Sequence, residues 1–129
     1  QLKKDLHEGL PPLMMQRAHL REIMVNLLVN AREAAGENGI VQISCRPSPQ
    51  YAIELRVKDS GEGIPLDQRE QIFEAYFTTK KKGTGLGLAI VKQNTELYGG
   101  EIVVESELGV GTEFILTFPT RVLLQENES

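Results

Sequence analysis

The sequence predicts an α+β fold, a two-layer α/β sandwich in which about three helices lie on one face of a mixed, mainly antiparallel sheet. Strand patterns occur in neighbouring pairs, and single segments with helical periodicity separate these pairs. The chain has 129 residues, about one domain, and 40% of them are apolar. We therefore expect one folded domain over residues 1–124 and a disordered polar tail over residues 125–129.

The first third of the chain predicts two short strands and a long helix. Residues 2–10 and 13–15 are expected to be extended. Residues 17–35 carry apolar side chains at the i, i+3, i+4, i+7 spacing of an amphipathic helix. Gly36 and Gly39 follow and are expected to end this helix.

The next segment predicts a β-hairpin. Residues 40–46 and 51–58 have the composition of strands, and the second alternates apolar with charged side chains from Ile53 to Lys58. The residues between them, 47–50, have the sequence PSPQ, which is typical of a turn. We therefore expect two antiparallel neighbours in the sheet.

The last half of the chain predicts two helices and a second hairpin. Pro65 can open a short helix that reaches about residue 76, and helical spacing returns over residues 86–98 before two glycines. Residues 102–105 and 112–118 are expected to form strands around a glycine-containing turn. The pattern contains no internal repeat.

Composition narrows the classes of partner. The chain has 14 basic and 18 acidic residues, and its net charge of −4 offers no positive field to a nucleic-acid backbone. No apolar run approaches the roughly 18 residues that span a membrane. The single cysteine, Cys45, excludes an internal disulfide, and the histidine and cysteine content does not fit a zinc site. We therefore expect a cytoplasmic domain that contacts neither nucleic acid nor membrane, which leaves open whether its parent protein is membrane-anchored.

Two asparagines stand one turn apart in the helix expected over residues 17–35. At about 100° per residue, Asn30 falls almost in line with the buried position of Ile23, and Asn26 lies along the border of the apolar face. A buried amide without partners costs about 1–3 kcal/mol, so both side chains need polar surroundings. Either they bond to neighbouring backbone, or they line a polar cavity in which an amide oxygen suits a hard cation such as Mg²⁺.

An acid followed by two glycines comes directly after the strand at residues 51–58. This segment, residues 59–65, reads DSGEGIP. Glycines let the backbone approach a flat ligand, and the Asp59 carboxylate can accept a hydrogen bond from an exocyclic amine such as that of adenine. An ordinary Asp/Gly turn that leads into a helix explains the same residues.

A glycine-rich segment, residues 83–88 with the sequence GTGLGL, stands directly before a predicted helix. Alternating glycines leave backbone N–H groups free to converge on an anion, and the helix N-terminus adds about half a positive charge. The segment matches neither the P-loop nor the dinucleotide fingerprint. Lys80 lies just upstream and is either part of a solvated charged turn or a phosphate contact. Phosphate binding is the function that this pattern favours.

In their order and spacing these segments resemble the ATP-binding catalytic domain of sensor histidine kinases, in the superfamily shared with gyrase, the MutL repair proteins and the heat-shock chaperone ATPase. The match runs from about Leu20 to Pro119. Its five boxes read LREIMVNLLVNA, DSGEGIP, IFEAYFTTK, GTGLGLAIV and GGEIVVESELGVGTEFILTFP. The short lid, FTTKKKGTGLGL, looks most like that of the nitrogen-regulation and sporulation kinases. The resemblance implies the Bergerat ATP-binding fold, with ATP and Mg²⁺ as ligands.

The resemblance also implies a role for each candidate residue. Asn30 would be the Mg²⁺ ligand, Asn26 its neighbour on the phosphate side, and Lys80 a cation that screens the phosphates. The adenine pocket would be formed by Asp59, Gly61, Gly63, Ile64 and Thr112. The phosphates would be held by Gly83, Thr84, Gly85, Leu86, Gly87 and Leu88. Phe73 and Phe77 would anchor the lid, although core packing explains them equally well. Many members carry a lysine and an aromatic where this chain has Glu33 and Ala34, so those contacts are not expected here.

The residue at position 26 bears on mechanism. Relatives that hydrolyse ATP carry a glutamate where Asn26 stands, and a carboxylate can activate water as a general base whereas an amide cannot. We therefore expect slow hydrolysis and transfer of the γ-phosphate to an external nucleophile. His7 precedes a Gly-Leu-Pro-Pro run that an acceptor helix would not tolerate, and His19 is expected at a helix surface or end.

By resemblance, the acceptor is a histidine on a dimerisation and phosphotransfer domain of the same kinase, outside this chain. The phosphate would then pass to the receiver domain of a response regulator. Two alternatives remain: an anti-sigma-factor-type protein serine kinase with the same nucleotide site, and an interaction module that ATP gates without phosphoryl transfer.

Overall fold

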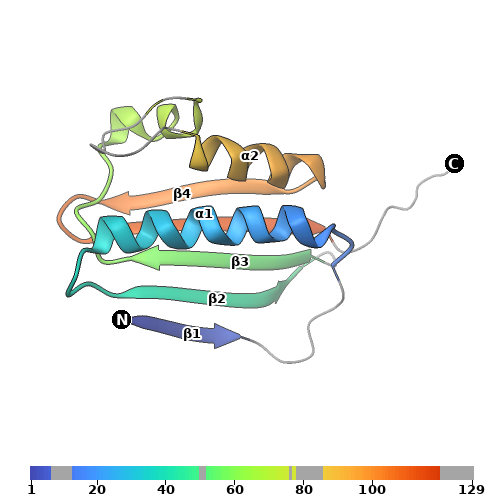
Figure 1. The fold of residues 1–129 in the computed structure, drawn as a ribbon, viewed down its shortest axis with the longest axis horizontal. Coiled ribbons are helices and arrows are strands. Elements are labelled where there is room, and N and C mark those ends of the chain that lie inside the picture. The colour runs from blue at the N-terminus through green and yellow to red at the C-terminus, as the bar shows by residue number, and fades with distance from the viewer. Residues whose placement is uncertain (7–12, 50–51, 76, 78–85, 120–129) are drawn as a thin grey trace, which may run out of the picture.

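The computed structural model describes residues 1–6, 13–49, 52–75, 77 and 86–119. Its elements, shown in Figure 1, are β1 (Leu2–Leu6), α1 (Arg17–Ala35), β2 (Val41–Ser48), β3 (Ala52–Asp59), two short 3-10 helices (Leu66–Gln68 and Gln71–Phe73), α2 (Gly87–Leu97), β4 (Glu101–Glu107) and β5 (Gly111–Pro119).

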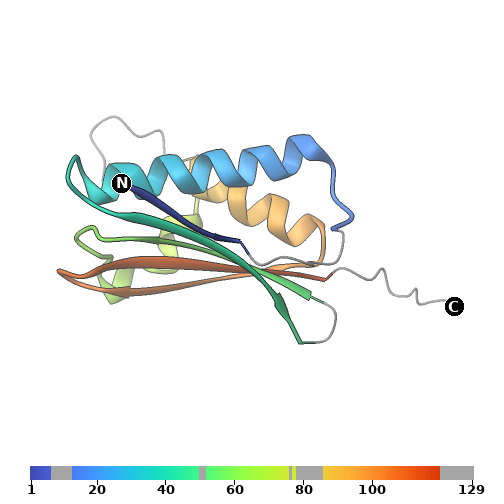
Figure 2. The same cartoon turned by 90° about the horizontal axis from the view of Figure 1, so that it is seen from below.

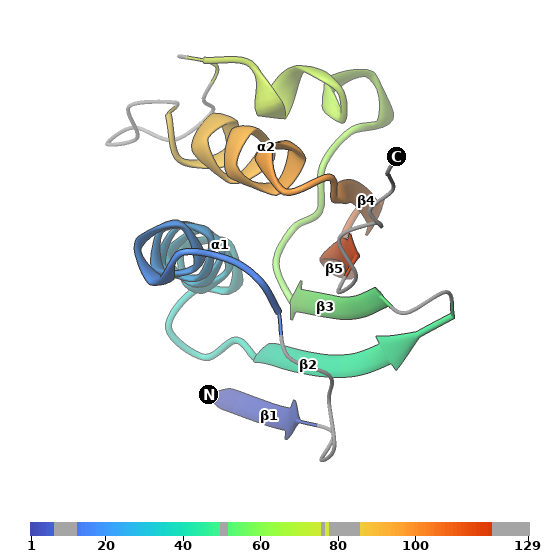
Figure 3. The same cartoon turned by 90° about the vertical axis from the view of Figure 1, so that its right-hand side faces the viewer.

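The strands form one five-stranded sheet in the order β1-β2-β3-β5-β4. Only β1 and β2 run parallel among the described strand pairs, and the other three pairs are antiparallel. Both α-helices lie on the same face of the sheet, side by side (Figures 2 and 3). The predicted two-layer sandwich with a mixed, mainly antiparallel sheet is therefore confirmed.

The first helix has the predicted bounds because its apolar stripe matches the sheet beneath it. Ile23, Leu27 and Ala31 are at most 1% exposed. Leu20 and Ala34 were expected on the same apolar side, but both are exposed because they lie near the ends of the helix. Burial of this stripe, at about 25 cal/mol per Å² of apolar surface, is what holds α1 against the sheet.

The core lies between this helix pair and the central strands. In the register of β3 and β5, Val57 stands opposite Phe114 and Leu55 opposite Leu116, and all four side chains are buried. Val91 of α2 is fully buried against the same cluster. Side chains of the opposite parity point to the open face of the sheet, where they meet water.

The structure differs from the expected strands and turns at residues 13–15 and at residues 47–50. Residues 13–15 form no strand: Leu13 and Met15 pack against the core, whereas Met14 is 67% exposed, so alternation occurs without strand pairing. The expected first strand ends at Leu6, and residues 7–12 lie outside the described residues. A turn was expected over residues 47–50, but Pro47 and Ser48 belong to β2 and pair with β3. Among the described residues, β1 pairs with β2 only as far as Cys45, so that pairing needs no N–H from Pro47.

The helix expected over residues 65–76 is also wrong. Its place is taken by two 3-10 helices of three residues each, because Arg69 between them bonds through Nε to the carbonyl of Ile64 at 3.3 Å and through Nη2 to that of Ser106 at 2.6 Å. These contacts outweigh the small gain from continuing so short a helix. Residue 76 lies outside the described residues.

Candidate functional site

Two segments contact one side of α1: the start of α2 and the loop after β3. Asn26, Asn30 and Ala34 stand one turn apart, so they span about 12 Å of the helix axis. At one end Gly87 lies against Asn26, since a β-carbon on Gly87 would be 2.9 Å from Oδ1 of Asn26. At the other end Gly61 lies against Ala34, where a β-carbon would be 2.4 Å from the carbonyl oxygen. Asn30 therefore lies between the start of α2 and the loop after β3.

The amide of Asn26 has a defined orientation. Its Nδ2 donates to the carbonyl oxygen of Glu22 at 2.7 Å, and its Oδ1 is the atom nearest to where a Gly87 β-carbon would stand. The backbone alternative thus holds for the donor of Asn26, which bonds to Glu22, while its acceptor faces the start of α2. Asn26 and Asn30 are both half-buried rather than part of the core.

The start of α2 presents backbone N–H groups. Leu86 precedes the first helical residue, Gly87, and no side chain in the described residues caps this end. The first N–H groups of a helix have no acceptor within it, and the helix dipole favours an anion there. Leu88 is half-buried and packs against the core. Gly83, Thr84, Gly85 and Lys80, the other expected phosphate contacts, lie outside the described residues.

The opposite end holds a buried carboxyl. Asp59, the last residue of β3, is 3% exposed, and its Oδ1 accepts a hydrogen bond from the backbone N–H of Gly61 at 2.8 Å. Burial raises the pKa of Asp59 above its ordinary value, while the backbone N–H groups of Gly61 and Thr112 oppose that rise. A desolvated carboxyl with a perturbed pKa is a common mark of a functional site.

Residues 59–65, which we call the acid–glycine loop, are tied to the turn between β4 and β5. The N–H of Ile64 donates to Oγ of Ser106 at 2.8 Å, and the N–H of Gly109 donates to the carbonyl of Glu62 at 2.8 Å. Arg69 adds its two bonds to the carbonyls of Ile64 and Ser106. Figure 1 shows this turn, the end of β3 and the C-terminal end of α1 gathered at one end of the molecule.

Thr112 lies directly beside Asp59. The two residues are paired in the register of β3 and β5, and Thr112 is 4% exposed. Gly111 makes this approach possible: its φ is +151°, and a β-carbon there would lie 2.0 Å from the carbonyl oxygen of Asp59. Gly63, at φ +85°, would likewise place a β-carbon 2.5 Å from the carbonyl of Glu107. The glycines in these segments are therefore required by close backbone packing.

Sequence reasoning missed three side chains that support these residues. Ser106 and Arg69 stand in polar runs that give no signal of a buried role. Asn94 does give one, because it occupies a core position of the α2 period three residues after Val91. It is 7% exposed, and its Nδ2 donates to Oε1 of Glu22 at 2.8 Å, which joins α2 to the helix that carries Asn26.

The aromatic residues of the expected lid pack on the core. Phe73 meets Phe114 edge to face with ring centroids 6.1 Å apart, and Lys92 lies 6.0 Å from the centroid of the Phe73 ring. Phe77 is half-buried against the same cluster. Core packing therefore accounts for both phenylalanines, and residues 78–85 of the expected lid lie outside the described residues.

His19 stands in the first turn of α1, as expected, and it is half-buried. Its Nδ1 is 2.5 Å from the hydroxyl oxygen of Tyr98 at the end of α2. This contact engages the ring at the opposite end of α1 from Ala34. His7, the other histidine of the chain, lies outside the described residues.

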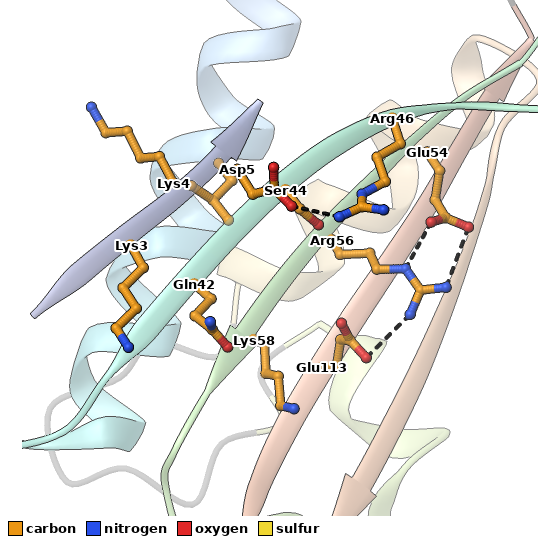
Figure 4. Close-up of a pocket in the computed structure, with 11 residues that line it drawn as sticks. Lys3, Lys4, Asp5, Gln42, Ser44, Arg46, Glu54, Arg56, Lys58 and Glu113 are labelled. Carbon is orange, nitrogen blue, oxygen red and sulfur yellow. Dashed lines mark hydrogen bonds and ion pairs between the residues drawn. The ribbon is translucent and has the colours of Figure 1, made fainter. Parts of the chain in front are cut away.

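A separate hollow of about 560 Å³ lies on the open face of the sheet. Figure 4 shows three ion pairs among its charged residues: Arg56 bonds to Glu54 at 2.7 Å and to Glu113 at 3.3 Å, and Arg46 bonds to Asp5 at 2.5 Å. Lys3, Lys4 and Lys58 line the hollow as well. The helices lie on the other face of the sheet. This hollow is therefore distinct from the side of α1 that faces the start of α2.

The described residues hold neither a ready-made metal cage nor a membrane-spanning helix. Among them, no three His, Cys, Asp or Glu side chains lie together in a way that could hold a metal ion. The helices that the structure describes are also too short or too polar to cross a bilayer.

Residues 15–122 match the family model described as histidine kinase-, DNA gyrase B-, and HSP90-like ATPase. The chain belongs to this ATPase family. The ATPase domain is 38% identical over 122 residues to the sensor histidine kinase ZraS of Escherichia coli (strain K12), which covers 95% of the chain and 26% of ZraS. It is 34% identical over 129 residues to sporulation kinase E of Bacillus subtilis (strain 168), of which it covers 18%.

Among solved structures, the catalytic domain of histidine kinase ThkA superimposes with a TM-score of 0.80 and 34% identity, over 92% of this chain and 79% of that one. The ATPase domain is thus a catalytic, ATP-binding domain of the sensor histidine kinase type, as predicted from the five boxes. It spans about a quarter or less of the length of the curated relatives named above.

Proposed function

We propose that this domain, over residues 1–124, binds Mg²⁺·ATP along α1 and donates the γ-phosphate to a histidine on a dimerisation and phosphotransfer domain of the same kinase. One observation carries the proposal. Along one side of α1, Gly87 at the N-terminus of α2, which no described side chain caps, abuts Asn26, and Gly61 of the acid–glycine loop abuts Ala34. The ends differ in chemistry: donors for an anion at one, a buried carboxyl at the other.

We assign the adenine base of ATP to the end of the site that holds the Asp59 carboxyl. Asp59 can accept a hydrogen bond from the exocyclic amine of adenine, and its burial strengthens such a bond. Gly61 and Gly63 let the acid–glycine loop pack closely against Ala34 and Glu107. We assign this loop, with Ile64, to the flat face of the base, and Thr112 supplies a second polar oxygen next to Asp59.

We assign the phosphates of ATP to the other end of the site, at the start of α2. The N–H groups of Leu86, Gly87 and Leu88 stand at the start of α2 and suit an anion. Gly83, Thr84, Gly85 and Lys80 are assigned to the same phosphates on the family pattern alone.

The residues between the two ends fit a magnesium ion. Mg²⁺ takes oxygen ligands and keeps several waters, so it needs only one or two protein ligands beside phosphate oxygens. The Asn30 amide oxygen can supply one, which agrees with the absence of an acidic metal cage in the described residues. When bound, the ion would neutralise charge on the phosphates.

The same residues favour transfer over hydrolysis. Asn26 has no carboxylate with which to activate water, and the carboxylate of Glu22, one turn earlier, accepts a hydrogen bond from Asn94. Phosphoryl transfer depends mainly on positioning and charge neutralisation, both of which the helix N-terminus and the asparagines can provide. We therefore assign the acceptor to another domain, with a response regulator receiver as the next carrier and the cytoplasm as the compartment.

The test combines this domain, radiolabelled ATP and a separately produced phosphoacceptor domain. We expect label on the acceptor that is lost in acid and kept in base, which is the behaviour of phosphohistidine. An acceptor whose histidine is replaced by alanine serves as the control. Acid-stable label on a protein serine would instead indicate the anti-sigma-factor type of kinase, and ATP binding without any transfer would indicate a gated interaction module.

A further inference from the structure

We infer that Ser106 determines which way the Thr112 hydroxyl donates, so that Asp59 and Thr112 present hydrogen-bond acceptors side by side to the base and favour an amino-substituted purine. The inference rests on the proposed function, because it concerns the base end of the same site. Ser106 acts through Thr112 and through the acid–glycine loop, and it is a positioning residue.

The hydrogen bonds at Ser106 can be counted. Its Oγ has one hydrogen to donate and two lone pairs to accept with. The N–H of Ile64 donates to it at 2.8 Å, which uses one lone pair. The carbonyl of Gly111, 3.0 Å away, has no hydrogen and can only accept, so it takes the single hydrogen of Ser106. The third contact, to Oγ1 of Thr112 at 2.8 Å, must then be donated by Thr112.

Thr112 is left with lone pairs only. Because its hydrogen is used on Ser106, Oγ1 can accept a hydrogen bond from a ligand but has none to give. The side chain is 4% exposed and lies opposite Asp59, which is 3% exposed and also accepts when it is ionised. Two neighbouring acceptors therefore border the pocket.

The surrounding contacts keep this arrangement in place. The backbone of Ser106 is held by Arg69, whose Nη2 donates to its carbonyl oxygen at 2.6 Å, while Nε of the same guanidinium reaches the carbonyl of Ile64. The backbone of Ser106 and the loop that carries Ile64 are thus bound to one rigid guanidinium group. Rotation of the Ser106 hydroxyl would leave the Gly111 carbonyl without this donor.

A pair of acceptors discriminates between purines at position 6. The amino group of adenine donates hydrogen bonds, whereas the oxo group of guanine or hypoxanthine accepts them. An oxo group facing Asp59 and Thr112 would meet lone pairs only. Loss of Ser106 frees the Thr112 hydrogen, which can then turn to the ligand and donate to an oxo group.

The experiment compares ATP with inosine triphosphate, whose base carries an oxo group at position 6 and a hydrogen on N1 where adenine has an amino group and an unprotonated N1, by calorimetric titration of the whole chain with Mg²⁺ present. For Ser106→Ala we expect the ratio of ATP to inosine triphosphate affinity to fall about tenfold. Ser106→Thr keeps the hydroxyl and should keep the ratio of the unsubstituted protein. Equal weakening of both nucleotides in Ser106→Ala would show that Ser106 only holds the loop, and it would overturn the inference.

A second variant keeps the test decisive if Ser106→Ala does not fold. Thr112→Val removes the acceptor itself and should also lower the affinity ratio, whereas an unchanged ratio would overturn the inference. In the Thr112→Val background, Ser106→Ala should have no further effect on the ratio, since the two side chains act through one hydrogen bond. If the unsubstituted protein binds neither nucleotide, the proposed function itself fails; if it binds ATP and only the variants disagree, the inference alone fails.

Discussion

Both faces of the sheet carry polar side chains, but these side chains find different hydrogen-bond partners on the two faces. On the open face, Arg56 bonds to Glu54 and Glu113, and the paired side chains keep 21–37% of their surface exposed. On the face covered by the helices, Asp59 and Thr112 are at most 4% exposed, and Asp59 bonds to backbone N–H groups rather than to a partner of opposite charge.

The difference shows what marks a site in this fold. The charges of Arg56, Glu54 and Glu113 compensate one another in high dielectric, where a surface ion pair contributes about 0–1 kcal/mol. A carboxyl on the covered face loses its hydration, and backbone donors only partly replace it, so a further donor is favoured there. Desolvation, rather than the density of charge, distinguishes the proposed nucleotide site from the charged hollow.

The largest expected effect on ATP affinity is at Asn30, in the middle of the proposed site. Asn30→Ala should lower the affinity for Mg²⁺·ATP at least ~100-fold, because it removes the amide oxygen that we assign to the magnesium ion. The fold should survive, since Asn30 is half-buried and alanine favours a helix. Calorimetry measures the affinity, and Asn38→Ala in the exposed turn after α1 is the matched control. Unchanged affinity in Asn30→Ala would remove this residue from the site.

The next largest effect on ATP affinity is expected at Asp59, at the end of the site assigned to the adenine base. Asp59→Asn should weaken ATP binding about 10–100-fold, since a charge-assisted hydrogen bond is replaced by an amide whose NH₂ faces a donor. Gln42→Glu on the open face changes charge without touching the covered face and should leave binding unchanged. Tight ATP binding by Asp59→Asn would contradict the assignment.

The pH dependence of stability gives an independent check on Asp59. Its pKa is raised in the folded state, so the folded protein binds this proton more tightly than the unfolded chain does. Stability from this group is therefore present at low pH and is lost as pH rises from the ordinary value of 3.8 through the raised one. Asp59→Asn should lack that loss, and thermal melts should show it as stable as the unsubstituted protein, or more so, at neutral pH. A lower melting temperature there would contradict this account.

A smaller effect is expected at the phosphate end. Gly87→Ala gains up to about 1 kcal/mol of helix propensity, but its β-carbon would press on Oδ1 of Asn26 at 2.9 Å. The two effects oppose each other in stability, while the displaced amide should lower ATP affinity about tenfold. Gln93→Ala, at an exposed position of α2, controls for general changes in that helix. If Gly87→Ala binds ATP as well as before, the contact between α1 and the start of α2 does not shape the site.

The smallest effect tests the open face. Arg56→Ala removes both ion pairs and should change the free energy of unfolding by about 0–1 kcal/mol, with less difference at high salt. ATP affinity should stay the same, because these side chains lie on the face away from the helices. A drop in affinity comparable with that of Asp59→Asn would erase the contrast between the faces.

Much of this molecule follows from short-range patterns. The bounds of α1 match the 3.6-residue period, and both hairpins match the alternation of their strands, because each signal depends on backbone geometry over a few residues. Residues 13–15 show where such patterns fail: alternation there reflects contact with the core, and no neighbouring strand pairs with it.

The candidate site likewise contains some residues that the sequence predicts and others that it does not. Asp59, Asn26 and Asn30 were predicted because their residue types stand in recognisable boxes. Ser106 and Arg69 were not, since their roles depend on the Ile64 backbone reaching a serine 42 residues away, and no local spacing encodes that contact.

By itself, the sequence determined the family, the two helices, the two hairpins and the residues expected to meet a nucleotide. The tertiary structure alone decided which of them meet: the register that sets Asp59 beside Thr112, the approach of Gly61 to Ala34, and the serine that orients the threonine. The physical reason is that periodicity is a property of neighbouring residues, whereas a buried polar group is satisfied by whichever atom the packed fold brings within hydrogen-bond distance.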